Sequence, residues 1–192
     1  MSILALTSDT LICTPATGNL EYNGQFFGTD SNASRAQLQR FVQGTAVAST
    51  SGTSIDFTGL PAWVKKITVM FSGVSGSGTS NFLLQIGDAG GIENTGYSGG
   101  SFNAGATANS TAGFDLTAQN LAAQVWGGSI TLTNLSGNIW CQSGVISGQS
   151  GGYIGASGGA KELSATLDRV RLTTVNGTDT FDAGSVNIIY EG

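Results

Sequence analysis

The sequence predicts an all-β protein, an antiparallel β-sandwich of jelly-roll type with a short N-terminal arm. Three observations support this fold class. Glycine accounts for 30 of the 192 residues, and there are only two prolines. From about residue 47 onward, short segments of alternating apolar and polar residues recur between clusters of Gly, Ser and Asn. No interval is long enough for the helical crossover of a parallel sheet, which favours antiparallel strands.

The arm is predicted to span residues 1–44, and the sandwich domain residues 45–192. Within the arm, residues 10–13 and 19–27 are typical of strands, and Asn23-Gly24 predicts a hairpin turn. Residues 31–41 are the best helical candidate of the chain, although their apolar spacing follows a helix only loosely.

The start of the arm was also considered as a signal peptide. Its apolar run, Ile3–Leu6, has no basic segment before it, and Asp9 follows soon after. We therefore expect an ordered or clamp-like arm of the mature protein.

The sandwich domain is predicted to contain strands separated by two long loops of small residues, 98–111 and 147–159. The expected strands are residues 54–57, 64–74, 81–88, 92–97, 113–116, 123–135, 139–146, 163–175 and 185–190. Near Asp168-Arg169 the alternation changes phase, which predicts a β-bulge or a bend.

The composition excludes several kinds of catalytic site. The chain has no histidine, so it cannot form a Ser-His-Asp triad or a histidine zinc site. Cys13 and Cys141 are too few for a four-thiolate metal site, and we expect them to stay reduced, with a disulfide as the alternative.

Acidic residues could still form a glycosidase carboxylate pair or a calcium site, but the sequence evidence for either is weak. Asp88 with Glu93, or Asp168 with Glu162, could flank a glycosidic bond, yet twelve acids supply such a pair by chance. No calcium-loop spacing is present. We therefore expect no enzyme activity, no catalytic residue, no metal and no cofactor.

The charge pattern bears on partners. The net charge is −5, and the seven basic residues are dispersed, which argues against nucleic acid. No apolar stretch approaches the roughly 18 residues of a membrane span, so no membrane insertion is expected. Between Glu93 and Lys161 the only charged residue is Asp115.

This stretch of small, uncharged residues predicts a subunit interface, because backbones can approach closely and few charges lose water. The alternative is a sandwich with a large core and long loops. A second functional interpretation is sugar binding through aromatic platforms. The candidate interface or glycan-facing aromatics are Tyr97, Phe102, Trp126, Trp140 and Tyr153.

Two segments resemble proteins of tailed bacteriophages. The segment TPATGNLEYNG (14–24), followed by Phe26-Phe27 and Ser34-Arg35, resembles an element common in tail fibres and other virion surface proteins. The segment IDFTGLPAWVKKITVMF (55–71) resembles the opening of a β-sandwich module in phage structural proteins, and similarity continues to VNIIYE (186–191).

The resemblance implies a homotrimeric, non-enzymatic protein on the virion, assembled in the host cytoplasm. Because the chain has no elongated shaft repeat, a capsid decoration (cement) protein is favoured over the alternative, a short tail-fibre or receptor-binding module. A carbohydrate-binding module is a further alternative.

The expected partners are other copies of the chain, the major capsid protein or tail proteins, and, for a fibre, a host surface glycan. The arm would then anchor the protein by strand addition or apolar burial. The candidate anchoring residues are Ile3, Leu4, Leu6, Leu11, Ile12, Tyr22, Phe26 and Phe27.

Overall fold

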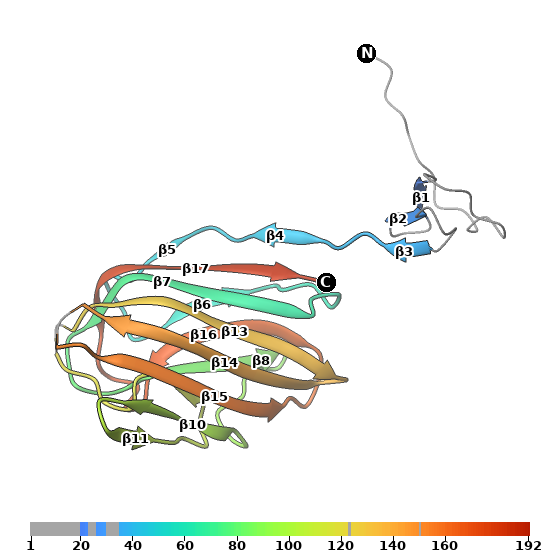
Figure 1. Ribbon diagram of the computed structural model, residues 1–192. Helices are drawn as coiled ribbons and strands as arrows, with labels where there is room; N and C mark the ends of the chain where they lie inside the picture. The colour runs from blue at the N-terminus through green and yellow to red at the C-terminus, as the bar shows by residue number, and fades with distance from the viewer. Residues whose placement is uncertain (1–19, 23–25, 30–34, 123, 150) are drawn as a thin grey trace, which may run out of the picture. The chain divides into compact units, whose positions relative to one another are not determined.

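The computed structural model describes residues 20–22, 26–29, 35–122, 124–149 and 151–192. The chain divides into two compact units, residues 1–40 and 41–192. Every regular element of the described residues is a β-strand, which confirms the all-β prediction (Figure 1).

The first unit contains a three-stranded antiparallel sheet in the order β1-β2-β3. Its strands are β1 (Leu20–Tyr22), β2 (Phe26–Thr29) and β3 (Arg35–Gln37). Tyr22 pairs with Phe26, so the two strands that flank Asn23-Gly24 form the predicted antiparallel pair. The strand predicted at residues 10–13 lies outside the described residues.

The predicted helix at residues 31–41 is wrong where the structure describes it. Residues 35–37 form β3 and pair with β2, and Phe41 begins β4 (Phe41–Gln43), which pairs with β17. A short segment with weak helical spacing gains more from ladder hydrogen bonds to existing strands than from one or two helical turns. Because β4 pairs with β17, the second unit begins at Phe41, whereas the sequence suggested residue 45.

The second unit is a sandwich of two antiparallel sheets, with nine and five strands. The large sheet has the order β11-β10-β15-β14-β13-β7-β17-β4, and β5 also pairs with β17. Its remaining strands are β5 (Val47–Ala48), β7 (Lys66–Gly76), β10 (Ser98–Asn103), β11 (Ala106–Ala108), β13 (Trp126–Ser136), β14 (Ile139–Gly148), β15 (Ile154–Glu162) and β17 (Phe181–Glu191).

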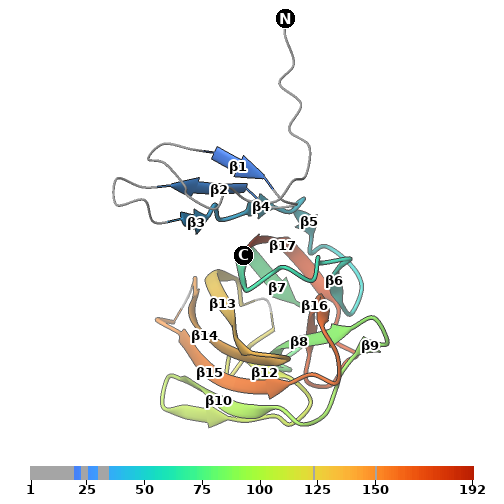
Figure 2. The ribbon, with the colours of Figure 1, turned by 90° about the vertical axis from the view of Figure 1, so that its right-hand side faces the viewer.

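The small sheet has the order β12-β8-β16-β6, and β9 pairs with β8. Its strands are β6 (Ile55–Thr58), β8 (Phe82–Asp88), β9 (Gly91–Ile92), β12 (Phe114–Asp115) and β16 (Leu167–Thr174). Figure 2 shows the strands of both sheets curving around a common interior.

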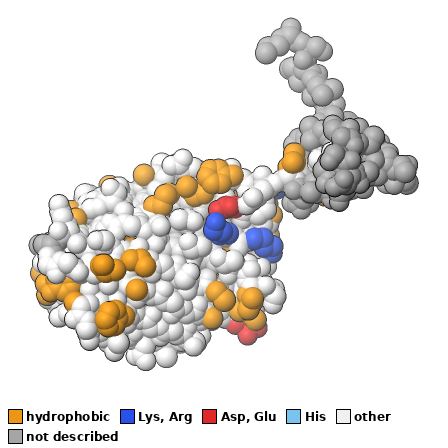
Figure 3. Space-filling model, in the orientation of Figure 1, with side chains coloured by type: hydrophobic (Ala, Val, Ile, Leu, Met, Phe, Trp, Pro, Cys, Tyr) orange, Lys and Arg blue, Asp and Glu red, His pale blue; other side chains and the backbone are white. Residues whose placement is uncertain are grey.

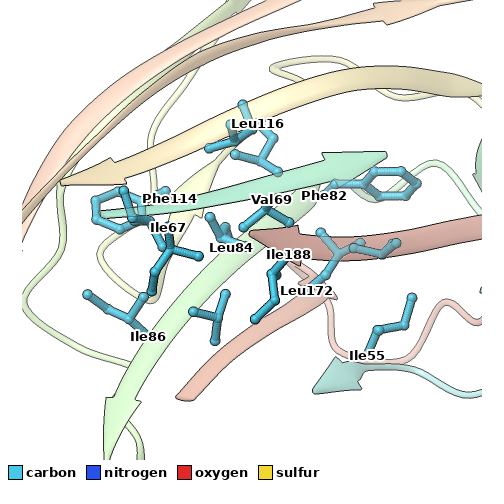
Figure 4. Packing of buried hydrophobic residues seen from close by; sticks show 14 of the residues in the cluster. Ile55, Ile67, Val69, Phe82, Leu84, Ile86, Phe114, Leu116, Leu172 and Ile188 are labelled. Atoms are coloured by element: carbon cyan, nitrogen blue, oxygen red, sulfur yellow. The ribbon is translucent and has the colours of Figure 1, made fainter. Parts of the chain in front are cut away.

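One hydrophobic core lies between the sheets, and both contribute to it. Ile67 and Val69 of β7 are buried, as are Leu84 and Ile86 of β8 and Leu172 of β16 (Figure 4). Alternate residues of β7 are buried, as expected for a strand with one face on a core. This alternation is why the sequence located β7, whereas all seven residues of β8 are buried.

The two predicted loops of small residues, 98–111 and 147–159, are wrong over the parts that form strands. Residues 98–103 and 106–108 form β10 and β11, and residues 154–162 form β15, which pairs with β14 along nine positions. Gly, Ser and Ala have low strand propensity, and here the neighbouring strands supply the hydrogen bonds that hold them extended. The predicted bulge is confirmed by a register shift between Leu167 and Arg169.

Candidate interaction surface

The outer face of the large sheet is the surface that points away from the core. Strand pairing places two rows of side chains in register across this face. In β7 these residues alternate with the buried residues Ile67, Val69 and Phe71. The first row is Thr107, Phe102, Ala156, Val145, Ser129, Met70 and Asn187. The second is Gly100, Gly158, Ser143, Thr131, Thr68 and Ile189. Together with Ile154, we call these rows the neutral face.

Charge on this side of the sandwich is confined to its margin. A third row, parallel to the other two, contains Lys66 opposite Glu191, and these side chains pair at 3.0 Å between Nζ and Oε1. In Figure 3 the blue and red side chains lie toward the end of the sandwich where Figure 1 marks the C-terminus. The neutral face itself therefore offers neighbours only hydroxyl, amide, thioether and hydrocarbon groups.

The charges that border the uncharged stretch of the sequence point inward. Lys161 is 7% exposed, and its Nζ lies 2.5 Å from Oε2 of Glu93, the residue at the other end of the stretch. The same Nζ lies 5.7 Å from the centre of the Tyr97 ring, a cation–π distance. An ion pair with a buried lysine and a partly exposed glutamate thus joins the two ends of the uncharged stretch.

Asp115, the one charge inside the stretch, is buried as well. Its carboxylate accepts hydrogen bonds from Asn81 Nδ2 at 2.9 Å and from Ser101 Oγ at 2.6 Å. The backbone N–H groups of Thr117 and Ala118 also donate to it. Among the described residues from 94 to 160, no charged side chain reaches the surface.

Of the two acid pairs offered for glycoside chemistry, Asp88 with Glu93 is held by hydrogen bonds, and Asp168 forms an ion pair with Arg169. Ser164 Oγ donates to Asp88 Oδ2, and the Ser164 backbone N–H donates to Glu93 Oε1, both at 2.7 Å. The Ser164 hydroxyl, aided by the Gly90 N–H, lowers the pKa of Asp88. Burial raises the pKa of Glu93, but hydrogen bonds from Lys161 and Ser164 outweigh burial and the net shift is downward. Both groups therefore stay ionised at neutral pH, a poor state for a general acid.

Three of the five candidate aromatics lie in the core. Tyr97, Trp126 and Trp140 are each at most 4% exposed. Trp126 Nε1 donates to Asn120 Oδ1 at 2.8 Å, and the Tyr97 hydroxyl accepts a hydrogen bond from the Ile86 N–H. Burial raises the pKa of Tyr97. The prediction that these three side chains face a sugar or a subunit interface is therefore wrong in this structure, because their side chains point into the core.

The other two aromatics differ from each other. Tyr153 is partly buried and packs against the core. Phe102 is 53% exposed and lies on the neutral face. Of the five, Phe102 is the one whose ring is available to a partner.

The candidate anchoring residues lie in or before the first unit. Ile3, Leu4, Leu6, Leu11 and Ile12 are outside the described residues. Tyr22 and Phe26 are opposite each other in the β1–β2 pair, and Phe27, in β2, is half-buried. The first unit thus brings Tyr22 and Phe26 together on its sheet.

Sequence reasoning missed two exposed apolar side chains of the neutral face. Val145 is 52% exposed and Ile154 is 55% exposed. Alternation in β14, where Trp140, Gln142 and Ile146 are buried, could have placed Val145 outward. No such signal existed for Ile154, because residues 147–159 read as a loop.

The outer face of the five-stranded sheet, which we call the small-sheet face, has a different character. Arg171 Nε lies 2.6 Å from Asp56 Oδ1, and Arg169 Nε lies 2.6 Å from Asp168 Oδ1. A hollow of about 400 Å³ over this face is lined partly by Gln85 and Arg171. The charged side chains of the small-sheet face are paired with each other and remain partly accessible to water.

No protein-family model, curated protein or solved structure matches this chain. In the described part of the chain, no three His, Cys, Asp or Glu side chains gather as metal ligands would. None of the described segments is a helix of the length and apolarity that crossing a membrane requires.

Proposed function

We propose that this chain is a non-enzymatic structural protein of a bacteriophage virion. In this proposal it is a homotrimeric capsid decoration (cement) protein that binds the particle through its N-terminal arm and exposes the sandwich. Its mechanism is adhesion, in which several identical contacts of modest strength act together. Its partners are its own copies and the major capsid protein or tail proteins of the virion, assembled in the host cytoplasm.

The observation that carries the proposal is the division of the chain. The phage-like element at residues 14–24 falls in the first unit, and the module-like segment at residues 55–71 opens the sandwich. The sandwich has its own core between two sheets. A short anchoring unit followed by an independent, displayed domain is the organisation that a decoration protein needs.

A jelly-roll connectivity belongs to the same proposal. The chain passes from the large sheet to the small sheet between β7 and β8, and returns between β16 and β17. Connections of this kind, between sheets rather than along one sheet, occur in Greek-key sandwiches.

Two alternatives remain from the sequence. A short tail-fibre or receptor-binding module would use the same anchoring arm, with outer strands that meet a host glycan. A free-standing carbohydrate-binding module is less favoured, because the two tryptophans that could stack on sugars are buried.

The test compares the full chain, a form lacking residues 1–40, and full-length Leu6→Glu/Leu11→Glu for binding to purified particles that lack the protein. We expect the shortened form to keep its folded circular dichroism spectrum, and both altered forms to bind particles about 100-fold more weakly. The matched control is Thr58→Glu/Ser54→Glu, which adds the same charge to the sandwich.

Full particle binding by both altered forms would contradict arm anchoring. Electron microscopy of decorated particles then separates the proposal from its alternative. Density on the capsid lattice supports a cement protein, and density on the tail supports a fibre module.

A further inference from the structure

We propose that the neutral face is the surface on which copies of this chain meet, so that its occupant is a second copy. The inference rests on the proposed homotrimer and adds to it the surface used. Around a three-fold axis, three neutral faces would turn toward the axis, and each would lie against the next.

The first argument is the exposed hydrocarbon on this face. Phe102 and Val145 are both opposite Ala156, on either side of β15, and Ile154 lies two residues from Ala156 on the same strand. Phe102, Val145 and Ile154 are each more than half exposed. Contiguous exposed apolar side chains on a strand face indicate a surface that is covered in the functional protein.

The second argument is shape. Beside the Phe102 ring lies an open hollow of about 590 Å³, whose lining includes Gly100 and Gly158. These two glycines are opposite each other in the β10–β15 pair. One face thus carries both projecting side chains and a shallow depression lined by glycines and mostly small side chains, which lets a copy of the same surface fit against it.

The third argument is electrostatic. An acidic, basic or nucleic-acid partner would find no counter-charge on either row of the neutral face, and its own charges would lose water without compensation. A second copy brings an equally uncharged surface.

The fourth argument is size. The rows cross seven strands, β11, β10, β15, β14, β13, β7 and β17. Each outward side chain occupies about 4.8 Å across the strands and about 6.6 Å along them, so the two rows and Ile154 cover roughly 440 Å² in projection. A stable interface buries about 800 Å² on each partner, so the contact would extend from these rows onto neighbouring residues of the sheet.

The test measures the assembly mass of the full-length protein by sedimentation equilibrium. We expect the unaltered protein to sediment at three times the chain mass of 19.4 kDa. Val145→Glu places a charge at the centre of the face, and we expect it to weaken association about 100-fold, because the charge would be buried unpaired. Thr58→Glu, an exposed strand position on the small-sheet face, is the matched control and should leave the mass unchanged.

Gly158→Glu is a second variant with less risk to the fold. A Cβ at Gly158 would meet only Gln142 O, at an ordinary 3.7 Å. We expect this variant to keep the unaltered circular dichroism spectrum and to lose the trimer. Phe41 lies on β4, the exposed edge strand of the large sheet, which is the other surface through which copies could associate. If the neutral face is the contact, Phe41→Glu should leave the mass unchanged.

A trimer that survives both Val145→Glu and Gly158→Glu overturns the inference, and so does a trimer lost only with Phe41→Glu. A monomeric unaltered protein also overturns it, even if a neutral sugar or a lipid vesicle then binds the face. Failure here is distinguishable from failure of the proposed function, because particle binding by the arm variants is measured separately.

Discussion

The two outer faces of the sandwich differ in the number of charged side chains that they expose. The small-sheet face keeps exposed ion pairs, Arg171 with Asp56 and Arg169 with Asp168. The neutral face has none: the Lys66–Glu191 pair lies at its margin, and the charges that border the uncharged stretch, Glu93 and Lys161, pair with each other, with Lys161 buried. Exposed charges keep a surface in water, and their removal from one face lowers the cost of covering that face.

The difference also shows that the few charged residues of the chain are distributed unevenly between the two sheets. The seven basic residues of the chain include Arg169 and Arg171, both on one strand of the small sheet. Strands β10 to β15, apart from β12, lie in the large sheet, and the residues that they contribute to the neutral face are uncharged. A global composition bias therefore becomes a distinction between two surfaces of one domain.

The largest expected effect on stability comes from breaking the pair beneath the neutral face. Glu93→Gln leaves Lys161, 7% exposed, as a buried cation without its carboxylate. We expect the free energy of unfolding to fall by about 3 kcal/mol, measured by urea denaturation. Glu93→Gln/Lys161→Met should recover part of this loss. A loss below about 0.5 kcal/mol for the single variant would show that the pair is not desolvated.

An intermediate effect is expected from acid. The pKa values of Asp88 and Glu93 lie below their ordinary values of 3.8 and 4.5. A carboxyl group with a lowered pKa in the folded state adds stability above its unfolded pKa, and this stability is lost as pH falls through the folded pKa. We therefore expect the melting temperature to fall between about pH 5 and about pH 2.

Ser164→Ala sharpens this measurement, because it removes the hydroxyl that donates to Asp88 and that also helps to lower the pKa of Glu93. The backbone N–H that donates to Glu93 is kept. The variant should melt at a lower temperature at neutral pH and lose less on acidification. Ser143→Ala, on the neutral face, is the control and should follow the unaltered pH profile. Identical profiles for all three proteins would refute the assignment to Asp88.

The smallest effect is expected on the small-sheet face. The Arg171 and Asp56 side chains are 36% and 35% exposed. Asp56→Asn should therefore cost at most about 1 kcal/mol, and the cost should shrink at high salt. Calorimetry at low and high ionic strength measures both. A salt-independent cost as large as that of Glu93→Gln would erase the proposed contrast between the faces.

The sequence was sufficient for strands that alternate large apolar residues with polar ones. β7 and β8 lie within two residues of their predicted bounds, and the bulge in β16 was visible as a change of phase. Burial on one face imposes this period of two. The same reasoning failed for β10 and β15, whose Gly, Ser and Ala residues carry no such pattern and whose extended form depends on neighbouring strands.

The candidate surface was predictable only in part. The uncharged stretch located β10 to β15, but Met70 and Ile189 join the same face from β7 and β17, which only strand pairing reveals. The fate of Trp126 and Trp140 likewise depends on which side of the sheet each residue takes. A one-residue difference in register decides that side, so sequence alone left it open.

The position of β17 has a consequence for how the sandwich forms. This strand lies between β7 on one side and β4 and β5 on the other, with Glu191 opposite both Lys66 and Phe41. β4 and β5 pair only with β17, so residues 41–48 cannot join the large sheet before residues 181–191 have been synthesised. Such distant pairings make folding slow, in the range of milliseconds to seconds, and leave open strand edges until the last pairing is made. During synthesis the sandwich would consequently fold late and almost all at once.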